Sequence, residues 1–260
     1  MRRLQRSALS EREQDWLDKK TAEICKKPEA ERKDHATKRW DIDKGNQASN
    51  PLGDIQKKLQ AMCSGLIRCM YCEDSQGHAI DHFWPKSTYP DRTFVWANLL
   101  YACSHCNSNG KRNQFPLDAD GQPLLIDPTA ENPNTHLLLT PSTGQLQARN
   151  LTATGQPSAK GEQSIAVFEL NRSELTLGRK DAWHGLLGLI DRYDRACSRS
   201  DATDQANLRS AICQHPFSSV LVSLLRIAEL PAGQRNPALL SSDDYLALSR
   251  RPEIKTWVTV

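Results

Sequence analysis

The sequence lacks any long apolar run. Its longest apolar stretches, at residues 137–139 and 220–225, are far shorter than the roughly 18 residues that a membrane-spanning helix needs. Residues 1–6 include three arginines and lead into a polar helical pattern without the apolar core of a secretory signal. We therefore expect no membrane partner and a cytoplasmic location, where reducing conditions keep cysteines from forming disulfides.

The sequence also lacks a large excess of charge of one sign. It contains 34 Lys and Arg against 31 Asp and Glu, which gives a formal net charge of +3. Such a chain is no polycation, so any binding to nucleic acid must come from local patches. The most charged run, residues 29–47, has Trp40 as its large apolar anchor, and it is either a solvated face or a surface that faces phosphate.

The 260 residues are enough for one large or two small domains with a buried core. A short strand is expected to end at residue 128, and a β-hairpin is expected at residues 137–147. The 217–230 segment is apolar nearly all round and is expected in the centre of a C-terminal core. Helical periodicity predicts helices in five segments: residues 10–27, 50–63, 165–170, 175–197 and 217–230.

Four of the eight cysteines form two CxxC pairs, Cys69 with Cys72 and Cys103 with Cys106, and 30 residues separate the pairs. Each pair can direct two thiolates to one side of a tight turn, and two such pairs close a tetrahedral zinc site. Four unrelated cysteines or a redox dithiol are the alternatives, which the matched spacing disfavours. Because four cysteines leave no open position on zinc, we predict a structural Zn²⁺. The other cysteines are expected as small apolar side chains: Cys25, Cys63, Cys197 and Cys213.

Residues suited to phosphodiester chemistry lie between and beside the two pairs. Asp81 and His82 are adjacent, Asn98 precedes the second pair, and Asn107 directly follows it with Lys111 nearby. This order resembles the HNH nucleases, in the subtype whose ββα-metal finger carries a four-cysteine zinc site. The resemblance implies an α+β fold that is mainly helical, with an embedded ββα-metal (HNH) finger and a small β-hairpin.

The HNH resemblance implies a role for each of these polar residues. His82 corresponds to the general base that activates water, and an imidazole with an unperturbed pKa of about 6.5 suits that task. Asp81 and Asn107 correspond to ligands of a catalytic divalent ion, Mg²⁺ or Mn²⁺, which prefers oxygen donors. Asn98 corresponds to the residue that ties the loop and so orients the His82 ring.

Two of these assignments leave alternatives open. Asn107 stands where many relatives have histidine, so Asn109 or His105 is an alternative metal ligand. His78 lies near His82 in the sequence and is an alternative base.

Basic and aromatic residues flank the predicted catalytic residues. Lys86, Lys111 and Arg112 are candidates for holding the phosphate backbone of a nucleic acid, and the alternative for each is a solvated side chain. Trp84 and Trp96 are expected to pack in the core of this small module rather than to stack on bases.

A narrower resemblance extends over roughly residues 50–190. It is to the PtuB-type nucleases of Septu antiphage defence and of retron-associated PtuAB modules. That resemblance implies a nucleic-acid substrate, DNA or RNA such as tRNA. It also implies a PtuA-like ABC- or SMC-type ATPase as partner, with a retron reverse transcriptase and its RNA/DNA hybrid as further components. The segments that carry it are residues 69–73, 82–86, 125–128, 132–137 and 168–175.

We therefore predict a metal-dependent HNH endonuclease that acts as the effector of an antiphage system. Residues 1–64 are expected to form an N-terminal helical segment, and residues 65–116 the HNH module with its zinc clip. Residues 117–260 are expected to form a mainly helical scaffold with the hairpin. The alternative is a non-catalytic zinc-ribbon subunit that binds nucleic acid or protein.

Overall fold

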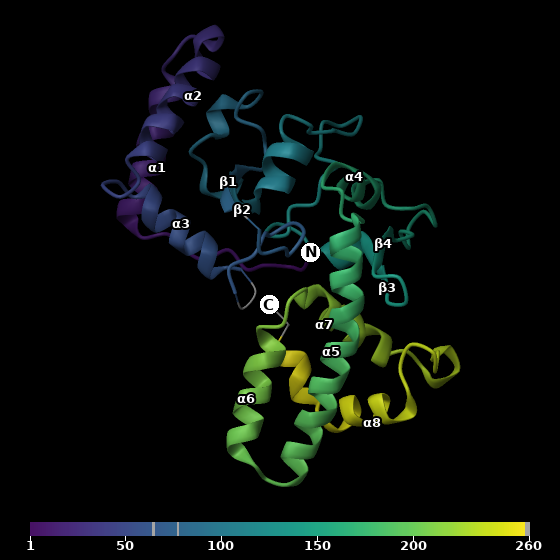
Figure 1. Cartoon of the computed structure of the whole chain (residues 1–260). Coiled ribbons are helices and arrows are strands. Elements are labelled where there is room, and N and C mark those ends of the chain that lie inside the picture. The colour runs from purple at the N-terminus through teal and green to yellow at the C-terminus, as the bar shows by residue number, and fades with distance from the viewer. Residues whose placement is uncertain (64–65, 77, 258–260) are drawn as a thin grey trace.

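The computed structural model describes residues 1–63, 66–76 and 78–257. Figure 1 shows helices α1 to α3 along one side, a small β1–β2 finger beside them, and helices α5 to α8 in a second lobe below. Helix α4 and the β3–β4 hairpin lie beside the finger and the start of α5. The expected fold class, mainly helical α+β with small antiparallel sheets, is confirmed.

Three helices form the N-terminal part: α1 (Glu11–Cys25), α2 (Glu29–Gly45) and α3 (Leu52–Ala61). Helix α1 begins as predicted, because the Ser10 hydroxyl and the Glu13 carboxylate cap each other's backbone N–H groups. Pro28 separates α1 from α2. The two helices pack together around a buried ion pair in which Lys20 Nζ lies 3.2 Å from Asp43 Oδ2.

The finger consists of two antiparallel strands and a turn of π-helix: β1 (His78–His82), β2 (Leu99–Cys103) and η3 (His105–Lys111). The register pairs His82 with Leu99 and His78 with Cys103. Every residue of β2 is buried. Helix α3 packs on β2, while α1 and α2 pack on the loop between the strands. The prediction that Asp81 and His82 lie on a strand is confirmed.

The C-terminal part contains the remaining elements: β3 (Leu137–Thr140), β4 (Gln145–Ala148), α4 (Ala159–Val167), α5 (Ser173–Ser198), α6 (Ala202–Cys213), α7 (Ser218–Ala228) and α8 (Ser242–Arg250). The predicted hairpin is confirmed as β3 and β4. Gly144 turns it with a φ of +69°, and a Cβ at Gly144 would meet the Thr176 carbonyl oxygen of α5. Helix α7 is largely buried, as predicted.

Several local predictions are wrong. Residues 124–128 form no strand, because the Ile126 N–H donates to Ser164 Oγ instead of to a strand partner. The helix expected at residues 165–170 already ends at Val167, since Glu169 takes a φ of +47°. Cys25 is exposed rather than part of the core. Helices α2, α6 and α8 were not predicted, and the apolar faces of α2 and α6 are weak.

The buried apolar residues form one continuous core that includes members of all three parts, among them Leu17, Leu100 and Leu186. Within the residues described, no single helix is long and apolar enough to cross a membrane. Helices α6 and α7 reach that length and composition only together, and a bend of 105° separates them.

Candidate functional site

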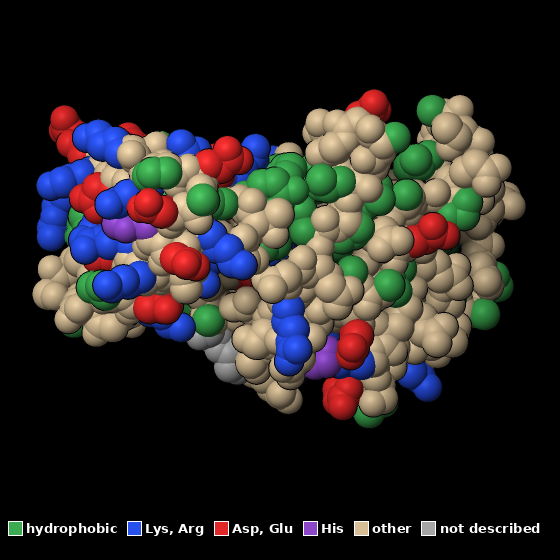
Figure 2. Space-filling view, turned by 90° about the horizontal axis from the view of Figure 1, so that it is seen from above, with side chains coloured by type: hydrophobic (Ala, Val, Ile, Leu, Met, Phe, Trp, Pro, Cys, Tyr) green, Lys and Arg blue, Asp and Glu red, His purple; other side chains and the backbone are tan. Residues whose placement is uncertain are grey.

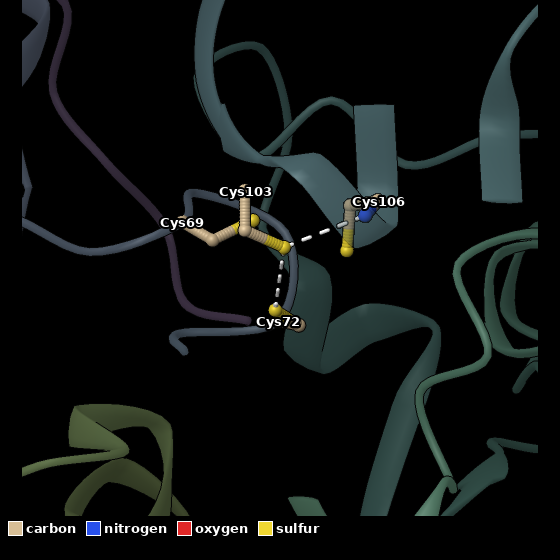
Figure 3. Close-up of side chains that lie close together, drawn as sticks. All are labelled: Cys69, Cys72, Cys103 and Cys106. Atoms are coloured by element: carbon tan, nitrogen blue, oxygen red, sulfur yellow. Dashed lines mark hydrogen bonds between the residues drawn. The ribbon is translucent and has the colours of Figure 1, made fainter. Parts of the chain in front are cut away.

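The four paired cysteines converge on one point. Their sulfur atoms all lie within 4.8 Å of one another, and all four side chains are buried (Figure 3). Cys72 Sγ lies 3.7 Å from Cys103 Sγ, much farther than the about 2.05 Å of a disulfide. Four sulfurs bound at about 2.3 Å to a tetrahedral zinc ion stand about 3.8 Å apart. The predicted cluster is confirmed, and its spacing fits a zinc site.

Backbone hydrogen bonds fix both cysteine turns. In the first, the Glu73 N–H donates to the Cys69 carbonyl at 2.9 Å, and the Cys69 N–H donates to the Asp74 carbonyl at 2.9 Å. In the second, the Cys106 N–H donates to Cys103 Sγ at 3.4 Å. Hydrogen bonds among the four thiols lower the pKa of Cys103 and raise that of Cys106.

A guanidinium from the C-terminal part reaches the cysteine cluster. Arg172, at the N-cap of α5, places Nη2 3.5 Å from Cys72 Sγ and 3.1 Å from Asp74 Oδ2. Four thiolates around one Zn²⁺ carry a net charge of −2, and a neighbouring cation offsets part of it. Arg172 therefore connects the start of α5 with the cysteine cluster.

His82 lies at the end of β1 with only 7% of its surface exposed. Its Nε2 lies 3.1 Å from the Thr93 carbonyl oxygen. Because a carbonyl oxygen only accepts, Nε2 carries the hydrogen, and Nδ1 of the neutral ring keeps a free lone pair. The Trp40 ring of α2 packs edge-on against the imidazole, with ring centroids 4.3 Å apart.

The protonation state of His82 follows from its surroundings. Burial lowers the pKa of His82 to about 3; the Asp81 carboxylate opposes this change, and the Lys111 ammonium adds to it. The imidazole is therefore neutral at pH 7, which is the form that accepts a proton.

Asn98 links the two ends of the loop that follows β1. Its Oδ1 accepts from the Trp84 N–H at 2.7 Å, and its Nδ2 donates to the carbonyls of Trp84 and Arg92 at 3.1 and 2.9 Å. Arg92 directly precedes Thr93, whose carbonyl holds the His82 ring. Asn98 itself is 3% exposed. Its contacts are those of a residue that shapes the loop around His82.

Asp81 is engaged on both of its carboxylate oxygens. Tyr71 Oη donates to Oδ2 at 2.7 Å, and Lys111 Nζ donates to Oδ1 and Oδ2 at 3.1 and 3.0 Å. The Lys111 ammonium also contacts the His82 carbonyl oxygen. Lys111 is 1% exposed. The structure therefore differs from the expected phosphate contact, because this ammonium is buried in an ion pair and unavailable at the surface.

A cavity of about 260 Å³ lies in front of β1. It brings together several predicted site residues with side chains of α2: Asp81, His82, Lys86, Asn107 and Arg112, with Trp40, Asp41 and Lys44. The Asp81 carboxylate and the Asn107 amide offer the oxygen donors that Mg²⁺ or Mn²⁺ prefers. These oxygen donors are chemically suited to a hard divalent ion. The Lys111 ammonium, however, already neutralises the Asp81 carboxylate.

Other predicted residues lie outside this cavity. Asn98 and Lys111 are buried and do not line it. His105, the alternative metal ligand, places Nε2 2.9 Å from Glu169 Oε2, and Asn109 is exposed to solvent. The side chain of His78, the alternative base, lies outside the described part of the chain.

Three residues with direct contacts to the site were missed by the sequence reasoning. Trp40 was noted only as the apolar anchor of a charged run, yet it contacts His82. Tyr71 stands inside the first CxxC pair, where its position was the only signal. Thr93 acts through its backbone carbonyl, which no side-chain pattern reveals.

Comparison with known proteins agrees with this geometry. Residues 69–112 match the HNH endonuclease family. The match includes both cysteine pairs, both strands with the loop between them, and the π-helical turn. The finger of this chain is therefore similar to HNH endonuclease domains.

The more specific similarity is to Septu protein PtuB. The chain is 30% identical to PtuB of Bacillus mycoides (strain KBAB4) over 151 residues, which cover 47% of this chain and 48% of the relative. It is 32% identical to PtuB of Bacillus thuringiensis over 110 residues, which cover 40% and 37% respectively. The chain thus matches less than half the length of these relatives.

Proposed function

We propose that this chain is a metal-dependent HNH endonuclease that hydrolyses phosphodiester bonds of nucleic acid in a Septu-type antiphage system. The observation that carries the proposal is the cavity in which neutral His82 lies next to Asp81 and Asn107. A finger closed by four cysteines holds this arrangement. The HNH match and the similarity to PtuB support it.

In this mechanism the chain's own residues hold and orient the reacting groups. His82 keeps its hydrogen on Nε2 through Thr93, so Nδ1 accepts the proton of the attacking water. Asn98 and the edge-on contact of Trp40 fix the plane of the ring. Lys86 and Arg112 line the same cavity and are suited to hold the phosphate backbone.

Two metal sites belong to the proposal. Cys69, Cys72, Cys103 and Cys106 would hold a structural Zn²⁺. Asp81 and Asn107 would hold Mg²⁺ or Mn²⁺, which supplies charge neutralisation on the phosphate and on the leaving oxygen. We also propose a PtuA-like ATPase as the partner, with retron components as further candidates, by analogy with PtuB-type systems.

A second function is favoured by one specific contact. Lys111 already balances the charge of Asp81, as expected if the carboxylate had a structural role. The chain would then be a zinc-clipped subunit that binds nucleic acid or protein without cutting. Cleavage measurements separate the two functions.

The test incubates the purified chain, alone and with the products of its neighbouring genes, with plasmid DNA and with tRNA. We expect cleavage with Mg²⁺ or Mn²⁺, its loss with EDTA, and its loss in His82→Ala. Gel electrophoresis of the products distinguishes nicked from linear DNA and whole from cut tRNA.

A matched control is His184→Ala, since His184 is an exposed histidine of α5 remote from the cavity. This variant should cleave like the wild type, and both variants should keep their zinc content and melting temperature. Full cleavage by His82→Ala would show that His82 is not the base. Absence of cleavage in every combination would show that the non-catalytic function is correct instead.

A further inference from the structure

We infer that helix α2 forms one wall of the nucleic-acid site, with Lys44 contacting the phosphate backbone of the bound strand. This inference rests on the proposed nuclease function and extends its substrate site beyond the HNH domain. The family match begins at residue 69, whereas α2 ends at Gly45. The helix therefore lies outside the matched HNH domain.

Helix α2 is firmly docked at the catalytic residues. Trp40 is 5% exposed, and its ring lies 4.3 Å from His82 and 5.5 Å from Phe94 between centroids. One turn further along, the Asp43 carboxylate is held by Lys20 of α1. With both contacts on the same side of α2, its C-terminal turns cannot leave the cavity without breaking buried contacts.

The cations around the cavity have no carboxylate partners. Lys44 comes from α2, while Lys86 and Arg112 come from the finger, and all three line the same space. Within the part of the chain that the structure describes, none of the three forms an ion pair with Asp or Glu. Arg39, on the same helix but away from the cavity, is paired with Asp43 at 3.1 Å. The unpaired cations thus gather where an anion would enter.

The charge of the cavity is positive overall. Two carboxylates also line it, but Asp81 is already neutralised by Lys111. Asp41 alone remains against the three cations. Figure 2 shows that Lys and Arg side chains also gather, mixed with acidic ones, over the end of the molecule formed by α1 and α2. A polyanion with regularly spaced phosphates is the ligand that suits cations on two separate walls.

The experiment measures binding rather than cleavage, so it is independent of turnover. The full chain carrying His82→Ala is titrated into a fluorescein-labelled 20-base-pair DNA duplex, and into single-stranded DNA and RNA of the same sequence. Fluorescence anisotropy gives Kd over a series of salt concentrations. The second change is Lys44→Gln, compared with Lys33→Gln, which removes an exposed lysine of α2 that does not line the cavity.

We expect Lys44→Gln to raise Kd roughly fivefold and to reduce the duplex salt slope by about 0.9, the value for one lost phosphate contact. Lys44→Arg should restore both, while Lys33→Gln should change neither. Equal effects of Lys44→Gln and Lys33→Gln, or no effect of Lys44→Gln, would overturn the inference. So would a failure of the His82→Ala chain to bind any of the three probes. If binding depends on Lys44 but the wild-type chain cleaves no substrate in the separate cleavage test, only the nuclease function is refuted.

Discussion

At the residue scale, the charge of Asp81 is balanced before any divalent ion binds. Lys111 contacts both carboxylate oxygens, and Tyr71 donates to one of them. Two unit charges about 4 Å apart interact by about 4 kcal/mol at an effective dielectric constant of about 20. A dication at Asp81 would therefore compete with the Lys111 ammonium for the same oxygens.

Lys111→Met removes this competition. Without added divalent ion, the variant leaves a buried carboxylate unpaired, so we expect the free energy of unfolding to fall by about 3 kcal/mol. Mn²⁺ should then bind at least tenfold more tightly than to the wild type, because the repelling ammonium is gone. Isothermal titration calorimetry gives the affinity, and urea denaturation with and without Mn²⁺ gives the stability.

The control for this change is Lys86→Met, which removes a half-buried lysine of the same cavity. It should alter the stability by no more than about 0.5 kcal/mol, as surface substitutions do. Unchanged or weaker Mn²⁺ binding by Lys111→Met would show that the ion pair supports Asp81 as a ligand rather than competing with a metal ion.

At the element scale, the π-helical turn His105–Lys111 carries one proposed metal ligand and one charge-balancing residue. Single π-helical turns inside proteins are frequent at functional sites. This turn packs closely on the end of α4: a Cβ added to Gly110 would lie 2.5 Å from the Val167 carbonyl oxygen. The position of Asn107 at the cavity thus depends on a glycine three residues later.

Gly110→Ala should disturb this packing. The obstructing atom belongs to backbone, so the turn must move away from α4, and we expect a loss of about 2 kcal/mol in the free energy of unfolding. Thermal and urea denaturation of the zinc-loaded protein measure it.

Gly45→Ala is the matched control, because nothing lies within 4 Å of a Cβ at that position. It ends α2, and the added methyl group restricts the unfolded chain, so the variant should gain roughly 0.5 kcal/mol. A loss as large as that of Gly110→Ala would mean that glycine packing at the turn is not the cause.

At the scale of the whole molecule, the first cysteine pair and its neighbour Glu73 contact parts of the chain that are distant in sequence. Arg172 of α5 donates to Cys72, and Glu73 accepts hydrogen bonds from Ser218 and Ser219 of α7. The buried core is continuous across the three segments 1–64, 65–116 and 117–260. That division remains a proposal about roles, and we expect the segments to unfold together.

Removal of the metal tests this coupling. Cys106→Ser should lower bound zinc from about one ion per chain to near zero, measured by inductively coupled plasma mass spectrometry. Because structural zinc stabilises a finger by roughly 10 kcal/mol or more, calorimetry should show the single melting transition shifted far downward. Cys213→Ser, outside the cluster, should retain zinc. Separate transitions for the finger and the α5–α8 lobe would contradict the continuous core.

Much of the site was predictable from local sequence because its signals are short in range. The spacing of the CxxC pairs identified the clustered cysteines, and the order of Asp81, His82, Asn98 and Asn107 placed the finger. Helix α1 followed from its capping box. By contrast, residues 124–128 resembled a strand because Leu125 and Ile126 are apolar, but burial against α4 rather than strand pairing explains them.

The amino-acid order alone determined which side chains are candidates to bind metal, since CxxC spacing and an Asp-His pair on a strand are constraints within a few residues. Only the tertiary structure decided which charged side chains are paired with an opposite charge and which are not. It buried Lys111 against Asp81, brought Trp40 and Lys44 across from α2, and set Arg172 beside the thiolates. These contacts span 30 to 100 residues, and their strength depends on burial, which no local pattern encodes.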